Sequence, residues 1–221
     1  MWPVRNANGL LCCLAYYTVL LSSSSITLNT ALLPLGSAGL ISTWLWLPLY
    51  ATLVCLSAFS HFQCMTTDPG FLPPNSIPAG FQSSSRICSK CNCLKTMRAH
   101  HCSLCHKCIL KMDHHCPWVN NCIGVRTAKL YLLFLVYLLV SCWLSVGLLG
   151  LKVGGCYWSY GELCEAGRDW RVFWGFYAGF MCFTFGVFLG FLLKDQARHI
   201  ITGTTAIEDL QKIAYSQVTF P

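Results

Sequence analysis

Four long apolar segments constrain this chain more than any other feature of its sequence. They cover residues 9–28, 39–62, 130–151 and 172–193. The hydrocarbon core of a bilayer is about 30 Å thick and a helix rises about 1.5 Å per residue, so roughly 20 apolar residues can cross it. Only 10% of the residues are charged, against about 25% in ordinary soluble domains. The sequence therefore predicts an all-α polytopic membrane protein with four transmembrane helices.

The first apolar segment has an alternative interpretation as a secretory signal peptide. Signal peptides combine a positively charged start with a cleavage site made of small residues. Only Arg5 supplies a charge ahead of this segment, and no clear cleavage site follows it. We therefore expect a retained helix, although the run from Ser22 to Ser25 dilutes its apolar character.

The distribution of positive charge predicts the orientation in the membrane. Residues 82–129, between the second and third apolar segments, contain eight Lys and Arg and a single acid, Asp113, so their formal charge is 8 − 1 = +7. Short loops rich in Lys and Arg stay in the cytosol. We expect this loop and both termini to be cytosolic. The cations also serve as topology signals and contacts for anionic lipid, and a loop held at a membrane is not expected to bind nucleic acid.

The apolar segments divide the chain into four expected parts. Residues 1–67 hold the first two transmembrane helices, and residues 68–129 hold a linker rich in Pro, Gly and Ser followed by a cysteine-rich domain. Residues 130–193 hold the last two helices, and residues 194–221 form a cytosolic C-terminal segment. Cys156 and Cys164, on the loop expected to face away from the cytosol, are candidates for a disulfide. No internal repeat is expected.

The cytosolic loop has a dense cluster of metal-binding side chains. Thirteen of them, eight cysteines and five histidines, fall between Cys88 and Cys122. Cytosolic thiols are kept reduced, so such a cluster favours metal over disulfides. Repeated Cys-x-x-Cys spacing is typical of tetrahedral zinc. Two closed sites use eight donors and leave five spare. Adjacent donors such as His101 and Cys102 project in different directions, so the two sites should interleave along the chain.

The stretch CSKCNCLKTMRAHHCSLCHKCILKMDHHCPWVNNCIG, residues 88–124, resembles the cysteine-rich domain of DHHC protein S-acyltransferases, also called palmitoyltransferases. The resemblance extends to the four apolar segments, to Asp68-Pro69-Gly70 and to a Thr-x-x-Glu motif at Thr205 to Glu208. It implies a cytosolic zinc-stabilised domain between the second and third helices. In the family this motif contacts the catalytic aspartate; Ala206 stands where the family often has a second threonine, and this departure leaves that contact open.

By this resemblance, two structural Zn²⁺ ions and one reactive thiol share the loop. The first zinc site falls on Cys88, Cys91, His101 and Cys108, and the second on Cys102, Cys105, His115 and Cys122. Cys116 is then the nucleophile, with His114 as its base and Asp113 as the group that orients the base. In an extended strand, His114 and Cys116 share one face while His115 points the other way.

The resemblance implies that Cys116 takes a long-chain acyl group, such as palmitoyl, from acyl-CoA and passes it to protein substrates with membrane-proximal cysteines. A stripe at helical spacing on the third apolar segment is expected to line the acyl chain, with Trp118 near its mouth. Ordinary helix packing or lipid contact is the alternative for this stripe. The cationic side chains of Lys95 and Arg98 are expected to contact the phosphates of CoA. The stripe consists of Tyr131, Phe134, Leu138 and Ser141.

Two other classes of function remain open. A zinc-dependent membrane adaptor would use the same metal sites without needing the thiol of Cys116. A channel or transporter should carry ionisable residues within its spans, and the four apolar segments contain no Asp, Glu, Lys or Arg. The resemblance implies an integral membrane protein of the endomembrane system, in the Golgi or the endoplasmic reticulum.

Overall fold

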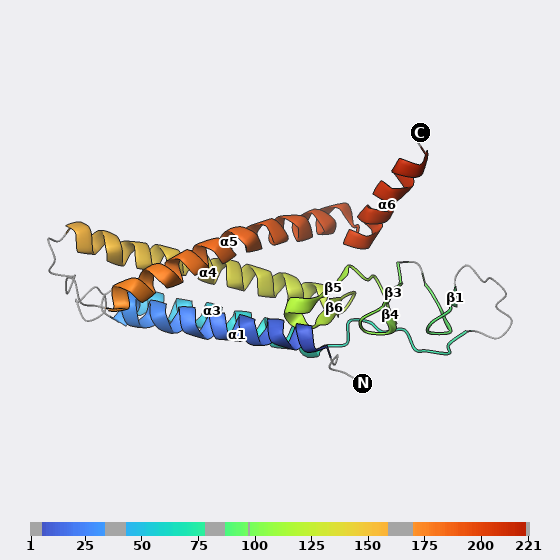
Figure 1. The fold of residues 1–221 in the computed structure, drawn as a ribbon, viewed down its shortest axis with the longest axis horizontal. Helices are drawn as coiled ribbons and strands as arrows, with labels where there is room; N and C mark the ends of the chain where they lie inside the picture. Colours follow the sequence, from blue (N-terminus) through green and yellow to red (C-terminus); the bar gives the residue numbers. More distant parts are fainter. Residues whose placement is uncertain (1–5, 34–42, 78–86, 97, 159–169, 220–221) are drawn as a thin grey trace. The chain divides into compact units, whose positions relative to one another are not determined.

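A computed structural model of the chain describes residues 6–33, 43–77, 87–96, 98–158 and 170–219. Figure 1 follows the elements in chain order. Four helices in these residues are long and apolar enough to cross a membrane, which confirms the predicted four-span plan. Cys164 of the candidate disulfide lies outside the described residues. The helices are α1 (Ala7–Thr27), continued by a short π-helix (Leu28–Leu32), α3 (Thr43–Thr66), α4 (Ala128–Trp158), α5 (Trp170–Thr202) and α6 (Ala206–Thr219).

The helix α5 is longer than its apolar segment predicts. It has 33 residues, so its length is about 50 Å at about 1.5 Å per residue, well beyond the roughly 30 Å of a bilayer core. The extension beyond residue 193 is polar and includes Lys194, Gln196 and His199. The helix ends before Gly203, whose φ of 65° is the left-handed conformation that commonly terminates helices. Hydropathy therefore located the membrane-spanning part of α5, but the helix continues in polar residues as far as its backbone hydrogen bonding does.

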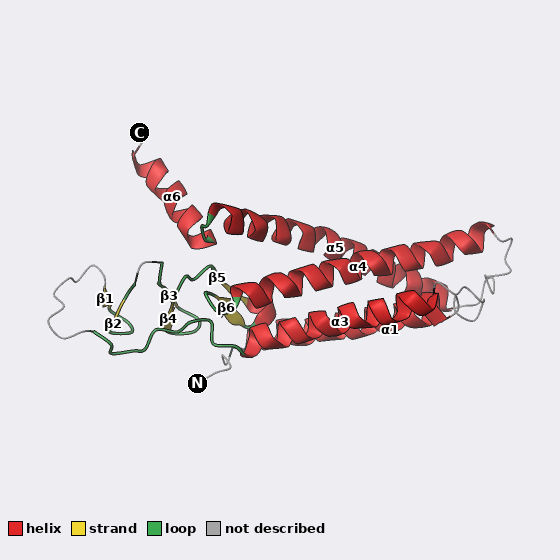
Figure 2. Ribbon diagram, turned by 180° about the vertical axis from the view of Figure 1, so that it is seen from behind, coloured by secondary structure: helices red, strands yellow, loops and turns green. Residues whose placement is uncertain are grey.

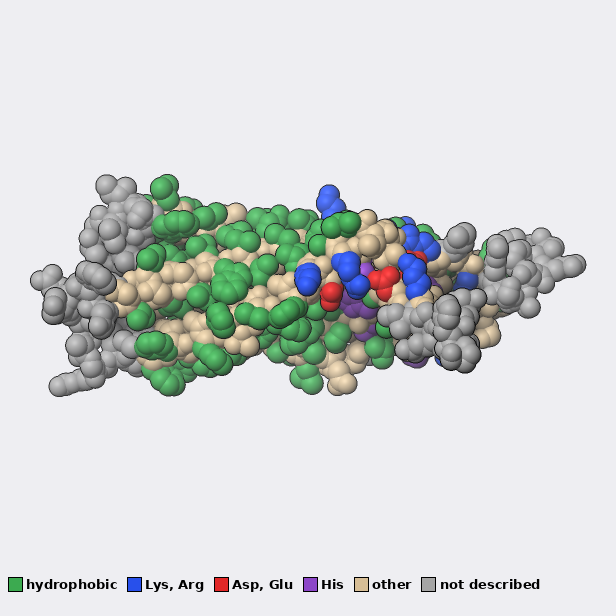
Figure 3. All heavy atoms as spheres, turned by 90° about the horizontal axis from the view of Figure 1, so that it is seen from above, with side chains coloured by type: hydrophobic (Ala, Val, Ile, Leu, Met, Phe, Trp, Pro, Cys, Tyr) green, Lys and Arg blue, Asp and Glu red, His purple; other side chains and the backbone are tan. Residues whose placement is uncertain are grey.

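The described helices contribute to two compact units. One unit, residues 15–59 and 133–194, is a four-helix membrane bundle. Its helices meet at a buried apolar cluster that includes Tyr50 of α3, Leu149 of α4 and Ala178 of α5. The hydroxyls of Tyr50 and Ser145 pair at 2.9 Å, because polar groups in a bilayer interior need partners from neighbouring helices. Figure 3 shows hydrophobic side chains over the outer faces of these helices.

The other unit, residues 1–14, 60–132 and 195–221, contains the cysteine-rich region. This region adds short strands to a mainly helical chain, and they form three separate antiparallel hairpins, coloured yellow in Figure 2. No strand among the described residues exceeds three residues, so these hairpins have little hydrogen bonding of their own. The hairpins are β1–β2 (Ile87–Cys88 and Cys93–Leu94), β3–β4 (His100–Cys102 and Lys107–Ile109) and β5–β6 (His114–Cys116 and Asn121–Ile123).

The three hairpins are copies of one unit, and the expectation that the chain lacks an internal repeat was wrong. Their paired residues follow a constant spacing of fourteen, since 102 − 88 = 14 and 116 − 102 = 14. The turn of each hairpin contains a residue in the left-handed conformation at the matching position, a conformation that Asn and His adopt more readily than most residues. The sequence already carried a trace of the repeat, because His-His-Cys occurs at residues 100–102 and again at 114–116. The pairs are Cys88 with Cys93, Cys102 with Lys107 and Cys116 with Asn121, and the turn residues are Asn92, His106 and Asn120, with φ of 49°, 53° and 46°.

Candidate functional site

The eight predicted zinc ligands gather in two clusters, each divided as expected. In the first, the Nδ1 atom of His101 lies 3.2 Å from the Sγ atom of Cys91, 3.7 Å from that of Cys88 and 3.9 Å from that of Cys108. In the second, the Nδ1 atom of His115 lies 3.4–3.7 Å from three sulfurs. Those sulfurs belong to Cys102, Cys105 and Cys122.

These distances fit four-coordinate zinc. With Zn–S of about 2.3 Å and Zn–N of about 2.0–2.1 Å, tetrahedral angles place ligand nitrogen and sulfur about 3.6 Å apart. All donor atoms within each cluster lie within 4.8 Å of one another. Four protein ligands close each cluster, so a bound zinc would hold the fold together and would have no open position for substrate. The region can therefore hold two structural metal ions.

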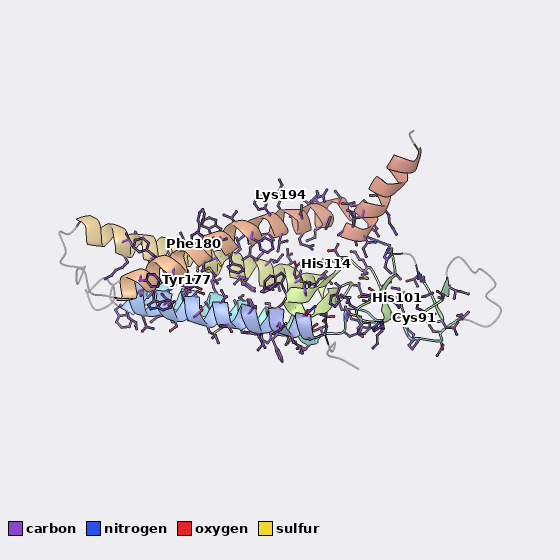
Figure 4. The ribbon with its side chains drawn as sticks, viewed as in Figure 1. Cys91, His101, His114, Tyr177, Phe180 and Lys194 are labelled. Atoms are coloured by element: carbon purple, nitrogen blue, oxygen red, sulfur yellow. The ribbon has the colours of Figure 1, made fainter. Side chains whose placement is uncertain are left out.

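The repeated hairpin explains how the clusters interleave. Each cluster combines the Cys-x-x-Cys turn of one hairpin with a His and a Cys that face each other directly across the next hairpin. His101 pairs with Cys108 in β3–β4, and His115 pairs with Cys122 in β5–β6. The central hairpin thus serves both clusters, giving its cross-strand pair to the first and its turn to the second. Figure 4 labels Cys91 and His101, which come from neighbouring hairpins.

Cys116, which takes no part in either cluster, lies at the end of strand β5 with only 3% of its surface exposed. It hydrogen-bonds to His114 on the same strand, while His115 between them turns to the second cluster. The edge of the His114 ring lies against the ring of Tyr131, with centroids 5.4 Å apart. The predicted alternation along an extended strand is therefore observed.

His114 is held in place by Asp113, whose Oδ2 atom lies 2.8 Å from its Nδ1 atom. Burial alone would lower the pKa of His114, but hydrogen bonds to Asp113 and Cys116, with the charges of these groups, raise it to about 9. The arrangement favours an imidazole that takes up a proton beside the thiol of Cys116. A cysteine paired in this way with a histidine is the arrangement of an activated thiol nucleophile.

Asp113 is fixed by two further donors from the C-terminal part of the chain. Its Oδ1 atom accepts a hydrogen bond of 2.7 Å from the backbone N–H of Ala206. Its Oδ2 atom accepts one of 3.0 Å from the side-chain amide of Gln196. Burial would raise the pKa of Asp113, but the bonds from His114, Ala206 and Gln196 outweigh it and lower the pKa to about 2.

These contacts include residues that sequence reasoning missed. Ala206 departs from the family pattern in its side chain, yet its backbone N–H makes the contact to Asp113, and a backbone group does not depend on residue type. The sequence analysis assigned Gln196 to the C-terminal segment and predicted no contact for it. The continuation of helical periodicity beyond residue 193 is the feature that could have indicated it.

The Thr-x-x-Glu motif is a capping box at the start of α6. The carboxylate of Glu208 accepts the backbone N–H of Thr205 at 2.9 Å, and the hydroxyl of Thr205 accepts the N–H of Glu208 at 3.4 Å. Such reciprocal bonds satisfy N–H groups that the first turn of a helix leaves open. The cap therefore sets the chain direction that aims the N–H of Ala206 at Asp113.

Arg98, predicted to contact CoA, has another role in the described residues. Its guanidinium makes a two-point ion pair with Glu208 and also donates to the carbonyl of Gly203 at 2.8 Å. These bonds attach the start of α6 to the cysteine-rich region. Lys95, the other predicted CoA contact, is partly exposed. The charged and histidine side chains visible in Figure 3 gather mostly over this unit.

The predicted acyl stripe on α4 is mainly buried. Tyr131, Phe134 and Ser141 are each no more than 5% exposed, and Leu138 is half-buried. The hydroxyl of Ser141 donates to the carbonyl of Tyr137 on its own helix at 2.7 Å. Because the hydroxyl is bonded within its own helix, Ser141 presents a small and weakly polar side chain to its surroundings. Trp118, expected near the mouth of the acyl site, is 38% exposed.

Removing one ligand from the second cluster should release one metal ion. We expect Cys105→Ser to hold one zinc per chain instead of two, because three ligands no longer close a tetrahedral site. Metal analysis of protein purified in detergent measures the ratio. The matched control is His106→Asn, next in sequence, at an exposed position outside both clusters where Asn tolerates the left-handed backbone. The assignment would be wrong if Cys105→Ser kept two ions or if His106→Asn lost one.

Comparison with known proteins agrees with this site. The family model described as DHHC palmitoyltransferase matches residues 82–213. Palmitoyltransferase ZDHHC7 of Mus musculus is 33% identical over 169 residues, covering 71% of this chain and 53% of the relative. Palmitoyltransferase ZDHHC3 of Homo sapiens is 30% identical over 221 residues, covering 96% and 73%.

A plant relative gives the same result. The probable protein S-acyltransferase 14 of Arabidopsis thaliana is 36% identical over 146 residues, covering 55% of this chain and 46% of the relative. The chain spans about half the length of the mouse protein. The family model's match over residues 82–213 covers the metal clusters, the Asp-His-His-Cys tetrad, the third and fourth membrane helices and the capping box. The chain belongs to the family of DHHC palmitoyltransferases.

Proposed function

We propose that this protein is an S-acyltransferase that moves a long-chain acyl group, palmitoyl in particular, from acyl-CoA to cysteine thiols of membrane-associated proteins. One observation carries the proposal. Cys116 lies outside both metal clusters and is hydrogen-bonded to a histidine that an ionised aspartate orients. A structural cysteine would need neither the histidine nor the buried carboxylate. Membership of the family supports the same chemistry.

The reaction has two stages. In the first, His114 takes the proton of Cys116, the sulfur attacks the thioester carbonyl of acyl-CoA, and the bond to the CoA sulfur breaks. His114 returns the proton to CoA, leaving an acyl thioester on Cys116. In the second, His114 deprotonates the substrate thiol, whose sulfur attacks this thioester; the bond to the Cys116 sulfur breaks, and His114 returns the proton to Cys116. Such proton transfer accounts for roughly 10²–10⁴-fold in rate, and positioning supplies further acceleration.

The two metal clusters take no step in this reaction. When bound, zinc would cross-link neighbouring hairpins and so hold β5 in register. The residue of this chain that transfers protons is His114, and Asp113 orients it. Asp113 keeps the Nδ1 side of the imidazole occupied, which leaves the Nε2 side to exchange a proton with sulfur. The bonds from Gln196 and Ala206 keep Asp113 itself from rotating away.

The acyl chain would lie along the stripe on α4 that begins at Tyr131. Each methylene taken out of water stabilises a bound chain by about 0.8 kcal/mol, which favours a site among apolar helices. Lys95 would contact CoA phosphates, and the cysteine-rich region would face the cytosol because its loop carries the excess of Lys and Arg. The proposed location is a Golgi or endoplasmic reticulum membrane. The proposed substrates are proteins with membrane-proximal cysteines.

Replacing the nucleophile tests the proposal directly. We expect Cys116→Ser to form no thioester with labelled acyl-CoA and to keep two zinc ions, because Cys116 is not a ligand. Label that hydroxylamine releases measures the acyl-enzyme. Cys93→Ser, at another buried thiol of the same region, is the control and should still be labelled. Metal loss in Cys116→Ser would return the residue to the ligands, and a wild-type protein that never labels would favour the adaptor.

Exchanging the charges of Arg98 and Glu208 separates docking of α6 from CoA binding. Arg98→Glu and Glu208→Arg should each slow acyl-enzyme formation about fivefold, because the pair is partly exposed and worth about 1 kcal/mol. The double variant should recover the part of the loss that comes from the ion pair, at unchanged KM for acyl-CoA, but not the part that comes from the bonds to Thr205 and Gly203. If Arg98 bound CoA phosphate instead, Arg98→Glu would raise KM and the second substitution would not restore it.

The chain-length preference tests the acyl stripe. Ser141 lies ten residues beyond Tyr131, or about 15 Å along a helix, which approaches the length of a sixteen-carbon chain. A phenylalanine there would crowd the site at a cost of about 1–3 kcal/mol, so Ser141→Phe should favour fourteen- over eighteen-carbon CoA esters. Val140→Phe, at a neighbouring position that is 44% exposed, should leave the ratio unchanged. An unchanged ratio in Ser141→Phe would assign the stripe to helix packing.

A further inference from the structure

The turn of the third hairpin carries no candidate metal ligand beyond Cys116, whereas the turns of the first two each carry a pair of candidate ligands. Adding fourteen to Cys91 gives Cys105, and adding fourteen again gives Val119, which is fully buried and has no metal-binding atom. After β6 the chain enters α4 at Ala128, so no further hairpin follows to supply a His and Cys pair. The described residues contain two metal clusters and no third. Cys116 therefore occupies the position of the zinc ligands Cys88 and Cys102 on a turn without zinc.

A turn that has lost its metal needs another support. The strands β5 and β6 have three residues each, and an isolated two-stranded hairpin is barely stable in water. Between them lies a short 3₁₀-helix, Pro117–Val119. The reactive sulfur of Cys116 is attached directly before this turn, so movement of the turn would displace it from His114.

The cytosolic end of α3 supplies this support. The Nε2 atom of His61 lies 2.9 Å from the carbonyl oxygen of Trp118 in the middle of the turn, so Nε2–H is the donor. The side-chain amide of Asn121 donates to the carbonyls of Cys64 at 2.8 Å and Thr67 at 2.9 Å. The carbonyl of Cys64 belongs to the last turn of α3, where a helix leaves carbonyls without partners. One histidine and one asparagine thus bond the hairpin to the helix in both directions.

The second hairpin differs from the third at the position of Asn121. The corresponding residue of the second hairpin is Lys107, which is partly exposed, and that of the first hairpin is Cys93, which is buried beside the ligands of the first cluster. His61 and Asn121 are both fully buried. In the third hairpin this position is covered by the end of α3, and the amide of Asn121 donates to the carbonyls there.

We infer that His61 and Asn121 are positioning residues for Cys116, holding from α3 the turn that zinc holds in the first two hairpins. The inference rests on the proposed acyl transfer and adds the residues that keep its nucleophile against its base. Neither side chain touches the reacting atoms. Their effect is on the distance and direction between the sulfur of Cys116 and the ring of His114.

The test measures alkylation of Cys116 by N-ethylmaleimide, quantified on its peptide by mass spectrometry, together with acyl-enzyme formation and zinc content. His61→Leu should slow both reactions of Cys116 at least tenfold, keep two zinc ions and leave the KM for acyl-CoA unchanged. His61→Gln, which retains a donor, should recover much of the rate. Phe62→Leu, at the next residue of α3 and 51% exposed, should behave as wild type.

A double-mutant cycle separates positioning from general stability. His114→Ala should slow alkylation strongly in the wild-type background and much less in His61→Leu, because the sulfur is already displaced from the ring. Additive effects would overturn the inference, and so would loss of zinc from His61→Leu. If His61→Leu does not fold, Asn121→Ser takes its place in the same cycle, with the same two outcomes. Alkylation needs no acyl-CoA, so a wild type that fails to acylate refutes the proposed function without deciding the role of His61.

Discussion

The sharing of the central hairpin by two metal clusters is the constraint on which the cysteine-rich region depends. The strand β3 carries His101 for one cluster and Cys102 for the other on successive residues. Because successive side chains of a strand point to opposite faces, adjacent ligands cannot serve one ion. Three weak hairpins are thereby linked in series, each fixed by its neighbour. The last of them, β5–β6, contributes His115 and Cys122 to the second cluster, but its own turn contributes no ligand to either cluster.

This arrangement explains how a zinc-binding region can contain a reactive thiol. The repeat places a cysteine at the same turn position three times, at residues 88, 102 and 116. In the first two hairpins the partner cysteine and the next hairpin complete a tetrahedron. In the third, Val119 takes the place of the partner, and α4 begins where a fourth hairpin would be needed. Cys116 consequently keeps the geometry of a ligand without a metal, while His114 and Asp113 supply a base in its place.

The Asp-His-His-Cys tetrad is short in sequence, yet distant segments hold it together. Asp113 receives hydrogen bonds from Gln196 near the end of α5 and from Ala206 at the start of α6. Arg98, on the connection between the first two hairpins, bonds the capping box that sets the direction of Ala206. A carboxylate that is 7% exposed needs such donors, because a buried charge without hydrogen bonds is costly. Residues far from the tetrad in sequence therefore stabilise the ionised carboxylate of Asp113.

The sequence by itself determined the membrane class, because apolar length and charge depletion leave no soluble alternative. The spacing of cysteines and histidines determined that the loop can hold metal ions. Resemblance to a known family divided the ligands between two clusters and left Cys116 outside both. The repeat of fourteen residues was present in the sequence but was hidden, since only ligands and turn residues recur. The tertiary structure alone decided what surrounds the tetrad, including Gln196, the backbone N–H of Ala206 and the hydrogen bonds of His61 and Asn121. Such contacts join segments far apart in the chain. Several of them use a backbone N–H or a carbonyl at the end of a helix, and every residue type has these groups except proline, which lacks the N–H, so the sequence does not mark them.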